Sequence, residues 1–291
     1  MQDDDCLSAT GALPVSPAST AWRLIPLLDA PGRIQMALDT WLLEQHRLGK
    51  HPPTLRFYTW SPAAISLGYH QYSVPDSWQH LTWQAQAIDW VHRPTGGRAV
   101  LHQGDLTYTL ITSGLQGSRL QIYRQLCTFL IQGWQKLGVR LHYGQAGRGY
   151  IHNPNCFGTA TGADLLLEDG CKLIGSAQLY RGQAILQHGS MRLATDAELF
   201  AQVFGESLPP LNWSSQVKAS LFSQTMESSI VQIIEGLVEA ACECFEVSIV
   251  LQPLSQSEWQ AVMAVAEEST RMQAGQLSRL GSGFKRLGDR R

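Results

Sequence analysis

Two side chains in this sequence are suited to acyl chemistry at sulfur, the thiol of Cys156 and the ammonium group of Lys172. A free thiol has a pKa of about 8.5, so only about 3% of it is thiolate at pH 7. An ammonium group that lowers this pKa by about two units turns most of the thiol into a nucleophile suited to thioester exchange. The spacing permits such a pair but does not require it, because hairpin counting leaves the two residues several positions apart. The alternative is a buried structural cysteine and a surface lysine.

A second candidate site is a pair of glycines between two expected strands. Gly96 and Gly97 lack the Cβ atoms that would keep a ligand away from the backbone. Arg93 and Arg98 flank the pair, and their guanidinium groups are able to hold a carboxylate or a phosphate. The alternative is an ordinary hairpin turn with solvated arginines.

Histidines lie near these segments without forming a metal-binding pattern. His102, His152 and His188 are the nearest, but the sequence has no His-x-x-x-His or carboxylate spacing typical of a metal site, so we expect no metal. No Gly-x-Ser-x-Gly motif marks a serine nucleophile. The six cysteines form no Cys-x-x-Cys pair, which is typical of free thiols in a reducing compartment.

Composition narrows the class of protein. The 291 residues are 44% hydrophobic and 16% charged, enough apolar side chains for a sizeable core. The 22 basic and 24 acidic residues give a net charge of −2, which disfavours nucleic acid or an anionic membrane as the main partner. No apolar run approaches the ~18–20 residues of a membrane span, and the start is acidic where a secretory signal is basic. We therefore expect a cytoplasmic protein that contacts neither nucleic acid nor membrane.

The elements that must position these residues are mixed in type. A period of 3.6 predicts helices over 34–43 and 120–137, the second ended by Gly138. Strands are expected over 55–60, 64–67, 88–92, 98–102, 106–112, 139–143, 163–168, 171–178 and 184–187, with a tight hairpin turn at Asp169-Gly170. A capping box at 195–198 opens a helix that ends at Gly205. The fold class is α+β, with mixed, mostly antiparallel β-sheets flanked by helices.

The chain divides into four expected parts. Residues 1–21 form a flexible N-terminal arm, and 22–205 the main domain. Residues 206–267 form a small C-terminal lobe with a helix over 230–244, a strand over 247–251 and a last helix capped at Ser255. The basic tail, 268–291, is expected to be disordered, the alternative being contact with an acidic partner.

Motifs of a known superfamily occur in order along this main domain. They are Met36-Ala37-Leu38-Asp39, Leu55-Arg56-Phe57-Tyr58-Thr59-Trp60, Ser66-Leu67-Gly68-Tyr69, Arg93-Pro94-Thr95-Gly96-Gly97-Arg98-Ala99-Val100-Leu101-His102, Gly175-Ser176-Ala177-Gln178 and Leu186-Gln187-His188-Gly189-Ser190. Over residues 22–205 the set resembles the lipoate–protein ligase, octanoyltransferase and biotin–protein ligase superfamily. Arg98 after the glycine pair, and a Cys-Phe ahead of the Lys-x-x-Gly-Ser-Ala-Gln strand, make LipM-type octanoyltransferases the nearest resemblance.

The resemblance implies a site and a reaction. Cys156 would be the nucleophile, and Lys172 would lower its pKa and polarise the acyl carbonyl. Substrate would be bound by Arg93, Gly96, Gly97, Arg98, His102, Gly175, Ser176, Ala177 and His188. An octanoyl group would pass from acyl carrier protein to a lysine of a lipoyl-domain protein, such as glycine cleavage H protein or a 2-oxoacid dehydrogenase E2, with no ATP or other cofactor.

Two features depart from the family, and two other functions stay open. The segment from Cys156 to Lys172 is one residue longer than in the family, and 158–162 is unusually small and polar. Cys171 is a competing thiol, but strand alternation points it away from Lys172. An ATP-dependent lipoate–protein ligase would use the glycine pair and Lys172 to hold an acyl-adenylate, with Mg²⁺ and without a thiol. A non-catalytic module would bind lipoyl domains or acyl chains.

Overall fold

The computed structural model describes residues 21–71, 74–144 and 164–271. Its main sheet has eight strands in the order β13-β1-β2-β8-β12-β11-β10-β9. The two pairs that β1 forms, with β13 and β2, are parallel, and the remaining pairs are antiparallel. The strands, in sheet order, are β13 (Ser248–Leu251), β1 (Ala21–Ala30), β2 (Thr54–Trp60), β8 (Asp105–Ser113), β12 (Ala184–Arg192), β11 (Lys172–Arg181), β10 (Leu165–Leu166) and β9 (His142–Tyr143). The expected α+β class with mixed, mostly antiparallel sheets is confirmed.

A smaller sheet carries the glycine pair. It has the order β6-β3-β7, from Asp89–His92, Ala64–Leu67 and Val100–His102. Residues 93–99, which we name the glycine loop, join β6 to β7. Helix α3 (Ala197–Phe204) packs on this sheet through Leu199 and Phe200. Nearby lie the 3₁₀ helix η1 (Asp76–His80) and the hairpin of β4 (Thr82–Trp83) and β5 (Gln86–Ala87).

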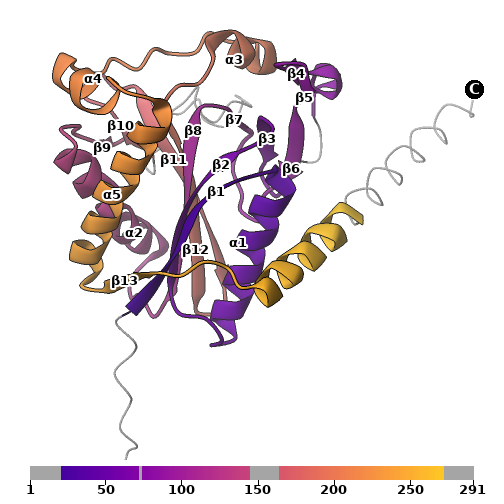
Figure 1. The fold of residues 1–291 in the computed structure, drawn as a ribbon, viewed down its shortest axis with the longest axis vertical. Helices are drawn as coiled ribbons and strands as arrows, with labels where there is room; N and C mark the ends of the chain where they lie inside the picture. Colours follow the sequence, from indigo (N-terminus) through magenta and orange to yellow (C-terminus); the bar gives the residue numbers. More distant parts are fainter. Residues whose placement is uncertain (1–20, 72–73, 145–163, 272–291) are drawn as a thin grey trace, which may run out of the picture.

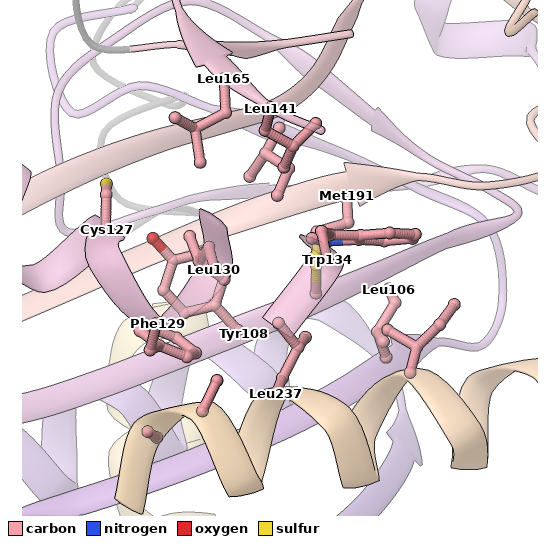
Figure 2. Packing of buried hydrophobic residues seen from close by; sticks show 14 of the residues in the cluster. Leu106, Tyr108, Cys127, Phe129, Leu130, Trp134, Leu141, Leu165, Met191 and Leu237 are labelled. Carbon is pink, nitrogen blue, oxygen red and sulfur yellow. The ribbon is translucent and has the colours of Figure 1, made fainter. Parts of the chain in front are cut away.

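Helices cover both faces of the main sheet (Figure 1). Helices α2 (Arg119–Lys136) and α5 (Met226–Phe245) lie on one face, where they bury alternate residues of β8, among them Tyr108. Figure 2 shows Tyr108 packed with Phe129, Trp134 and Leu237. Helix α1 (Gly32–Arg47) and a C-terminal helix, described over 256–271, lie on the opposite face. Within the described residues, no helix is both long and apolar enough to cross a membrane.

Local capping chemistry sets several of these boundaries. Ser118 and Gln121 form a reciprocal capping box that opens α2. Gly170 takes a positive φ in the turn between β10 and β11, as the hairpin signal predicted. The cap of α3 is Asp196, whose carboxylate accepts from the Leu199 N–H at 2.8 Å. The N-cap therefore lies one residue beyond the expected Thr195, and Leu199 at the third helical position cannot complete the expected capping box.

Residues 206–267 pack tightly against the rest of the chain. Strand β13 pairs with β1 at the edge of the main sheet, and α5 packs along α2. A short helix, α4 (Ser215–Leu221), joins the same core through Val217 and Leu221. The boundaries drawn for a separate C-terminal lobe stay a prediction. Strand β1, at the start of the main domain, is an element that the sequence analysis did not predict.

Candidate active site

One cavity of about 140 Å³ gathers the predicted site. The predicted residues that line it are Arg93, Gly96, Gly97, Arg98, His102, Lys172, Gly175, Ser176, Ala177 and His188. Cys156 lies outside the described residues. Residues that line the cavity but were not predicted include Met36, Tyr58, Trp60, Ser66, Val100, Thr107 and Asp164. The ordered motifs therefore meet in three dimensions, although they are spread over residues 36–190.

The cavity lies between the main sheet and the glycine loop. Its lining crosses four neighbouring strands, from Lys172 on β11, through Gly189 on β12 and Thr107 on β8, to Tyr58 on β2. With about 4.8 Å between strands, this path is roughly 14 Å long. Lys172, Asp164 and Ser176 are polar groups at the β11 end, and Met36 of α1 adds an apolar side chain to the lining. The extent of the lining suits an elongated ligand.

Lys172 supplies a buried positive charge to this cavity. Its side chain is 4% exposed, and Nζ lies 2.8 Å from Oδ1 of Asp164. A Cβ atom at Gly175 would lie 2.9 Å from Lys172 Cε, so the missing side chain makes room for the ammonium group. Asp164 was missed in the sequence, where a lone aspartate before a hairpin carries no distinguishing signal. The carboxylate of Asp164 offsets part of the cost of burying a cation at this position.

Arg93 orders the glycine loop from within. It is 7% exposed, and its guanidinium group donates to the carbonyls of Ser66 (3.0 Å), Gly96 (3.0 Å) and Arg98 (2.7 Å). Gly97 has φ +106°, and a Cβ atom there would lie 2.7 Å from Arg93 Nη2. These contacts require glycine at 97 and give Arg93 a structural role; binding of an anion by Arg93 and Arg98 stays a prediction.

His102 joins β7, the strand that follows the glycine loop, to β3. Its Nδ1 lies 2.8 Å from Asp105 Oδ2, and its Nε2 lies 2.8 Å from Ser66 Oγ. The ring stacks on Trp60 with the centroids 3.8 Å apart. Both ring nitrogens are therefore occupied by protein atoms, which fixes β7 against β3 at the edge of the cavity.

His188 lies on the floor of the cavity, on β12, and is also held at both ring nitrogens. Its Nδ1 is 3.0 Å from Asp39 Oδ2, and its Nε2 is 2.7 Å from Thr95 Oγ1 in the glycine loop. Burial lowers the pKa of His188 below its ordinary value despite the nearby carboxylate. Burial alone would raise the pKa of Asp39, but Arg56 and a hydrogen bond from His188 hold it below its ordinary value. The pair is thus a carboxylate and a neutral imidazole at pH 7.

None of the described cysteines lines the cavity. Cys127 is fully buried in the core beneath α2, and burial raises the pKa of its thiol to about 12. The thiol of Cys171 accepts from Arg192 Nη2 at 3.1 Å and packs at the margin of the same core. Neither sulfur is therefore placed to share the cavity with Lys172, as strand alternation predicted for Cys171.

Comparisons with known proteins show the family of this chain. The family model of the lipoyl protein ligase A/B catalytic domain matches residues 31–233. An octanoyltransferase LipM from Kyrpidia tusciae is 38% identical over 192 residues, which cover 62% of this chain and 69% of the relative. A LipM from Carboxydothermus hydrogenoformans is 30% identical over 249 residues, covering 81% of this chain and 91% of the relative.

Solved structures share the fold of this chain, and at their low sequence identity they show the fold alone. A lipoate-protein ligase A bound with ATP superposes with a TM-score of 0.65 at 21% identity, covering 85% of this chain and 94% of that one. A bipartite lipoate protein ligase from Thermoplasma acidophilum, solved in a study with its E2 lipoyl domain, gives 0.63 at 18% identity, covering 86% and 92%. On the strength of the family model and the curated relatives, this chain belongs to the lipoyl protein ligase A/B catalytic domain family, as an acyltransferase of the LipM octanoyltransferase type.

Proposed function

We propose that this protein moves an octanoyl group from octanoyl-acyl carrier protein to a lysine of a lipoyl domain through a thioester on Cys156. The observation that carries the proposal is the Lys172 ammonium group, buried beside Asp164 at the β11 end of the cavity. Relatives named octanoyltransferase LipM support the acyl group, and the description of the family model, a lipoyl protein ligase, supports the acceptor class. Both proposed substrates are proteins that we expect in the cytoplasm, so the transfer needs no contact with a membrane.

The proposed chemistry has two transfers. The Cys156 thiolate, having lost its proton to solvent, attacks the thioester carbonyl of the donor; a new C–S bond forms to Cys156, the C–S bond to the carrier breaks, and the carrier thiolate that leaves takes up a proton from solvent. The neutral amine of the acceptor lysine then attacks the acyl-enzyme, giving an amide and returning the thiol to Cys156. Lys172 would stabilise the thiolate and the oxyanion, with backbone N–H groups near Gly97, Ser176 and Ala177. Thioester to thioester is nearly isoenergetic and thioester to amide is downhill, so the sequence needs no ATP.

The cavity offers apolar surface for the acyl chain. Apolar and aromatic side chains in its lining are Met36, Tyr58, Trp60 and Val100, with His102 and Thr107 beside Trp60. At about 1.2 Å per bond of an extended chain, the seven C–C bonds of an octanoyl group span roughly 8–9 Å of the available length. Burial stabilises such a chain by about 0.8 kcal/mol per CH₂, which is enough to favour eight carbons over much shorter acids.

Mass spectrometry of the protein mixed with octanoyl-acyl carrier protein tests the proposal. Without ATP we expect a covalent octanoyl adduct on the wild-type chain, absent in Cys156→Ala and retained in the matched control Cys171→Ala. Addition of a lipoyl domain should then discharge the adduct and acylate the domain. A wild-type chain that forms no adduct, and modifies the domain only with free acid, ATP and Mg²⁺, would overturn the transferase in favour of the ligase. An adduct retained in Cys156→Ala would overturn the nucleophile.

A further inference from the structure

Three side chains from separate elements form a buried hydrogen-bonded chain behind the cavity. Asp39 of α1 is fully buried, His188 of β12 is 5% exposed, and Thr95 of the glycine loop is 1% exposed. Asp39 Oδ2 lies 3.0 Å from His188 Nδ1, and His188 Nε2 lies 2.7 Å from Thr95 Oγ1. The chain thus links a helix on one face of the sheet, through the sheet's own strand, to the loop that closes the cavity.

The Asp39 end of this chain is fixed to the sheet. Its Oδ2 also accepts from Thr109 Oγ1 at 2.9 Å and from the Tyr58 hydroxyl at 3.3 Å, and its Oδ1 lies 3.1 Å from Arg56 Nε. A carboxylate held by groups on β2 and β8 cannot rotate without breaking several bonds at once. His188 is therefore oriented from below, in the way a buried carboxylate orients an imidazole in hydrolytic sites.

Both ring nitrogens of His188 are held by protein groups. A carboxylate only accepts, so Nδ1 of His188 must carry the proton that it donates to Asp39. Nε2 is then the acceptor in a neutral ring, and the Thr95 hydroxyl donates to it. Neither ring nitrogen is left for a substrate proton, and Thr95 does not line the cavity. The arrangement therefore supports the glycine loop and does not bring a proton to the cavity.

We propose that Asp39 and His188 are positioning residues which act through Thr95 to fix the backbone of Gly96 and Gly97 against the cavity. This inference rests on the proposed acyl transfer at the same cavity. A glycine pair is conformationally permissive, so a loop that contains one needs outside constraints to present its N–H groups. Arg93 holds the loop by donating to the Gly96 carbonyl. The hydrogen bond between the Thr95 hydroxyl and His188 holds the loop independently, from β12.

A pair of substitutions at residue 95 tests the role. Thr95→Val keeps the side-chain shape and removes the hydroxyl, whereas Thr95→Ser keeps the hydroxyl. Because a misplacement of about 1 Å at a reacting group can cost ~100-fold in rate, we expect Thr95→Val to slow single-turnover octanoyl-enzyme formation by roughly 10- to 100-fold. Thr95→Ser should restore most of the rate. The half-saturating concentration of octanoyl-acyl carrier protein and the pH midpoint of the reaction should not change, since the donor contacts and the titrating thiol are untouched.

Thr54→Val is the matched control. Thr54 is 2% exposed on β2, outside the cavity lining, and its hydroxyl bonds only to the Pro52 carbonyl at 3.1 Å in the described contacts. The Thr54→Val variant loses one buried hydroxyl, as Thr95→Val does, and should keep the wild-type rate of octanoyl-enzyme formation. Hydrogen exchange of a peptide covering 93–98 gives a readout independent of activity, with faster exchange in Thr95→Val and not in Thr54→Val.

A double variant tests whether the residues act as one unit. His188→Gln combined with Thr95→Val should lose no more rate than the slower single variant, because each change breaks the same support. Losses that multiply, an unchanged rate in Thr95→Val, or a pH midpoint that moves with His188→Gln would each overturn the positioning role. A wild-type chain that forms no acyl adduct would instead overturn the proposed function itself, whatever the exchange data show.

Discussion

At the scale of single residues, the position of one ammonium group depends on an absent side chain. Lys172 reaches into the cavity past Gly175, where a Cβ atom would lie 2.9 Å from Lys172 Cε and 3.0 Å from Nζ. Atoms at those distances must move apart, and the flexible end of the lysine is the part that gives way. Glycine at position 175 therefore leaves room for the Lys172 side chain, in addition to letting a ligand approach the backbone.

We expect Gly175→Ala to slow octanoyl-enzyme formation at pH 7 by about tenfold or more while leaving the melting temperature nearly unchanged. The deficit should narrow toward pH 9, because an unassisted thiol ionises itself near its ordinary pKa of about 8.5. Stopped-flow or quenched acylation across this pH range measures both effects. In a Lys172→Ala background the same glycine substitution should cost nothing further, and an equal loss in both backgrounds would refute this explanation.

At the scale of elements, two glycines in one helix interface differ in what surrounds them. A Cβ atom at Gly133 of α2 would lie 2.7 Å from Leu237 Cδ2 and 3.0 Å from Leu237 Cα on α5. A Cβ atom at Gly236 of α5 would meet only the side chain of Leu137, at 3.4 Å, which is an ordinary contact. The first glycine sets the distance between the helices, and the second does not.

The two alanine substitutions should therefore change stability in opposite directions. Alanine is intrinsically better than glycine in a helix by up to about 1 kcal/mol, and Gly236→Ala should gain part of this. Gly133→Ala must push α5 from α2 and should destabilise by about 1–3 kcal/mol despite the same propensity gain. Urea unfolding of both variants provides the measurement; a stabilising Gly133→Ala would mean that the helices separate at little cost.

Sequence predicted the elements wherever the signal was local. The helix ends at Gly138 and Gly205 and the turn at Gly170 are each set by residues within a few positions, and each marks a boundary in the structure. Strand β1 was missed because it contains a buried charge, Arg23, and a proline, Pro26, and is defined by its partners β2 and β13.

The same distinction holds at the candidate site. Ordered motifs identified the residues that line the cavity, and their juxtaposition there agrees with the resemblance. The groups that hold them, Asp39, Asp105 and Asp164, had no predicted role, because a carboxylate's partner is decided by tertiary contacts and not by spacing. No local pattern distinguishes an aspartate that orients His188 from one at the surface.

At the scale of the whole molecule, the last described helix is fastened to the first strand. Arg23 of β1 is 1% exposed, and its guanidinium group lies 2.6 and 3.0 Å from the two carboxylate oxygens of Glu258. It also donates to the carbonyls of Gln252 and Pro253. The C-terminal helix thereby stays against α1, as Figure 1 shows. Hydrogen bonding to Arg23 lowers the pKa of Glu258 to about 2.

This ion pair should make stability sensitive to acid. A carboxylate with a folded pKa of about 2, against an ordinary 4.5, stabilises the fold above pH 4.5, and the contribution is lost as pH falls from 4.5 toward 2. The full difference corresponds to at most about 3 kcal/mol. Glu258→Gln should therefore be less stable at pH 7 and closer to wild type at pH 3, by urea unfolding at each pH. An equal difference in unfolding free energy between the two proteins at pH 7 and at pH 3 would contradict this.

The Arg23–Glu258 contact also limits how early this part of the fold can be completed during translation. The partners are separated by 235 positions, so at roughly 5–20 residues per second a ribosome adds Glu258 about 10–50 s after Arg23. Through that interval the guanidinium group has neither its carboxylate nor its two carbonyl acceptors, and water must solvate it. The edge of the nascent sheet beside β1 therefore stays unpaired through most of translation. It is covered only after β13 and Glu258 have been synthesised.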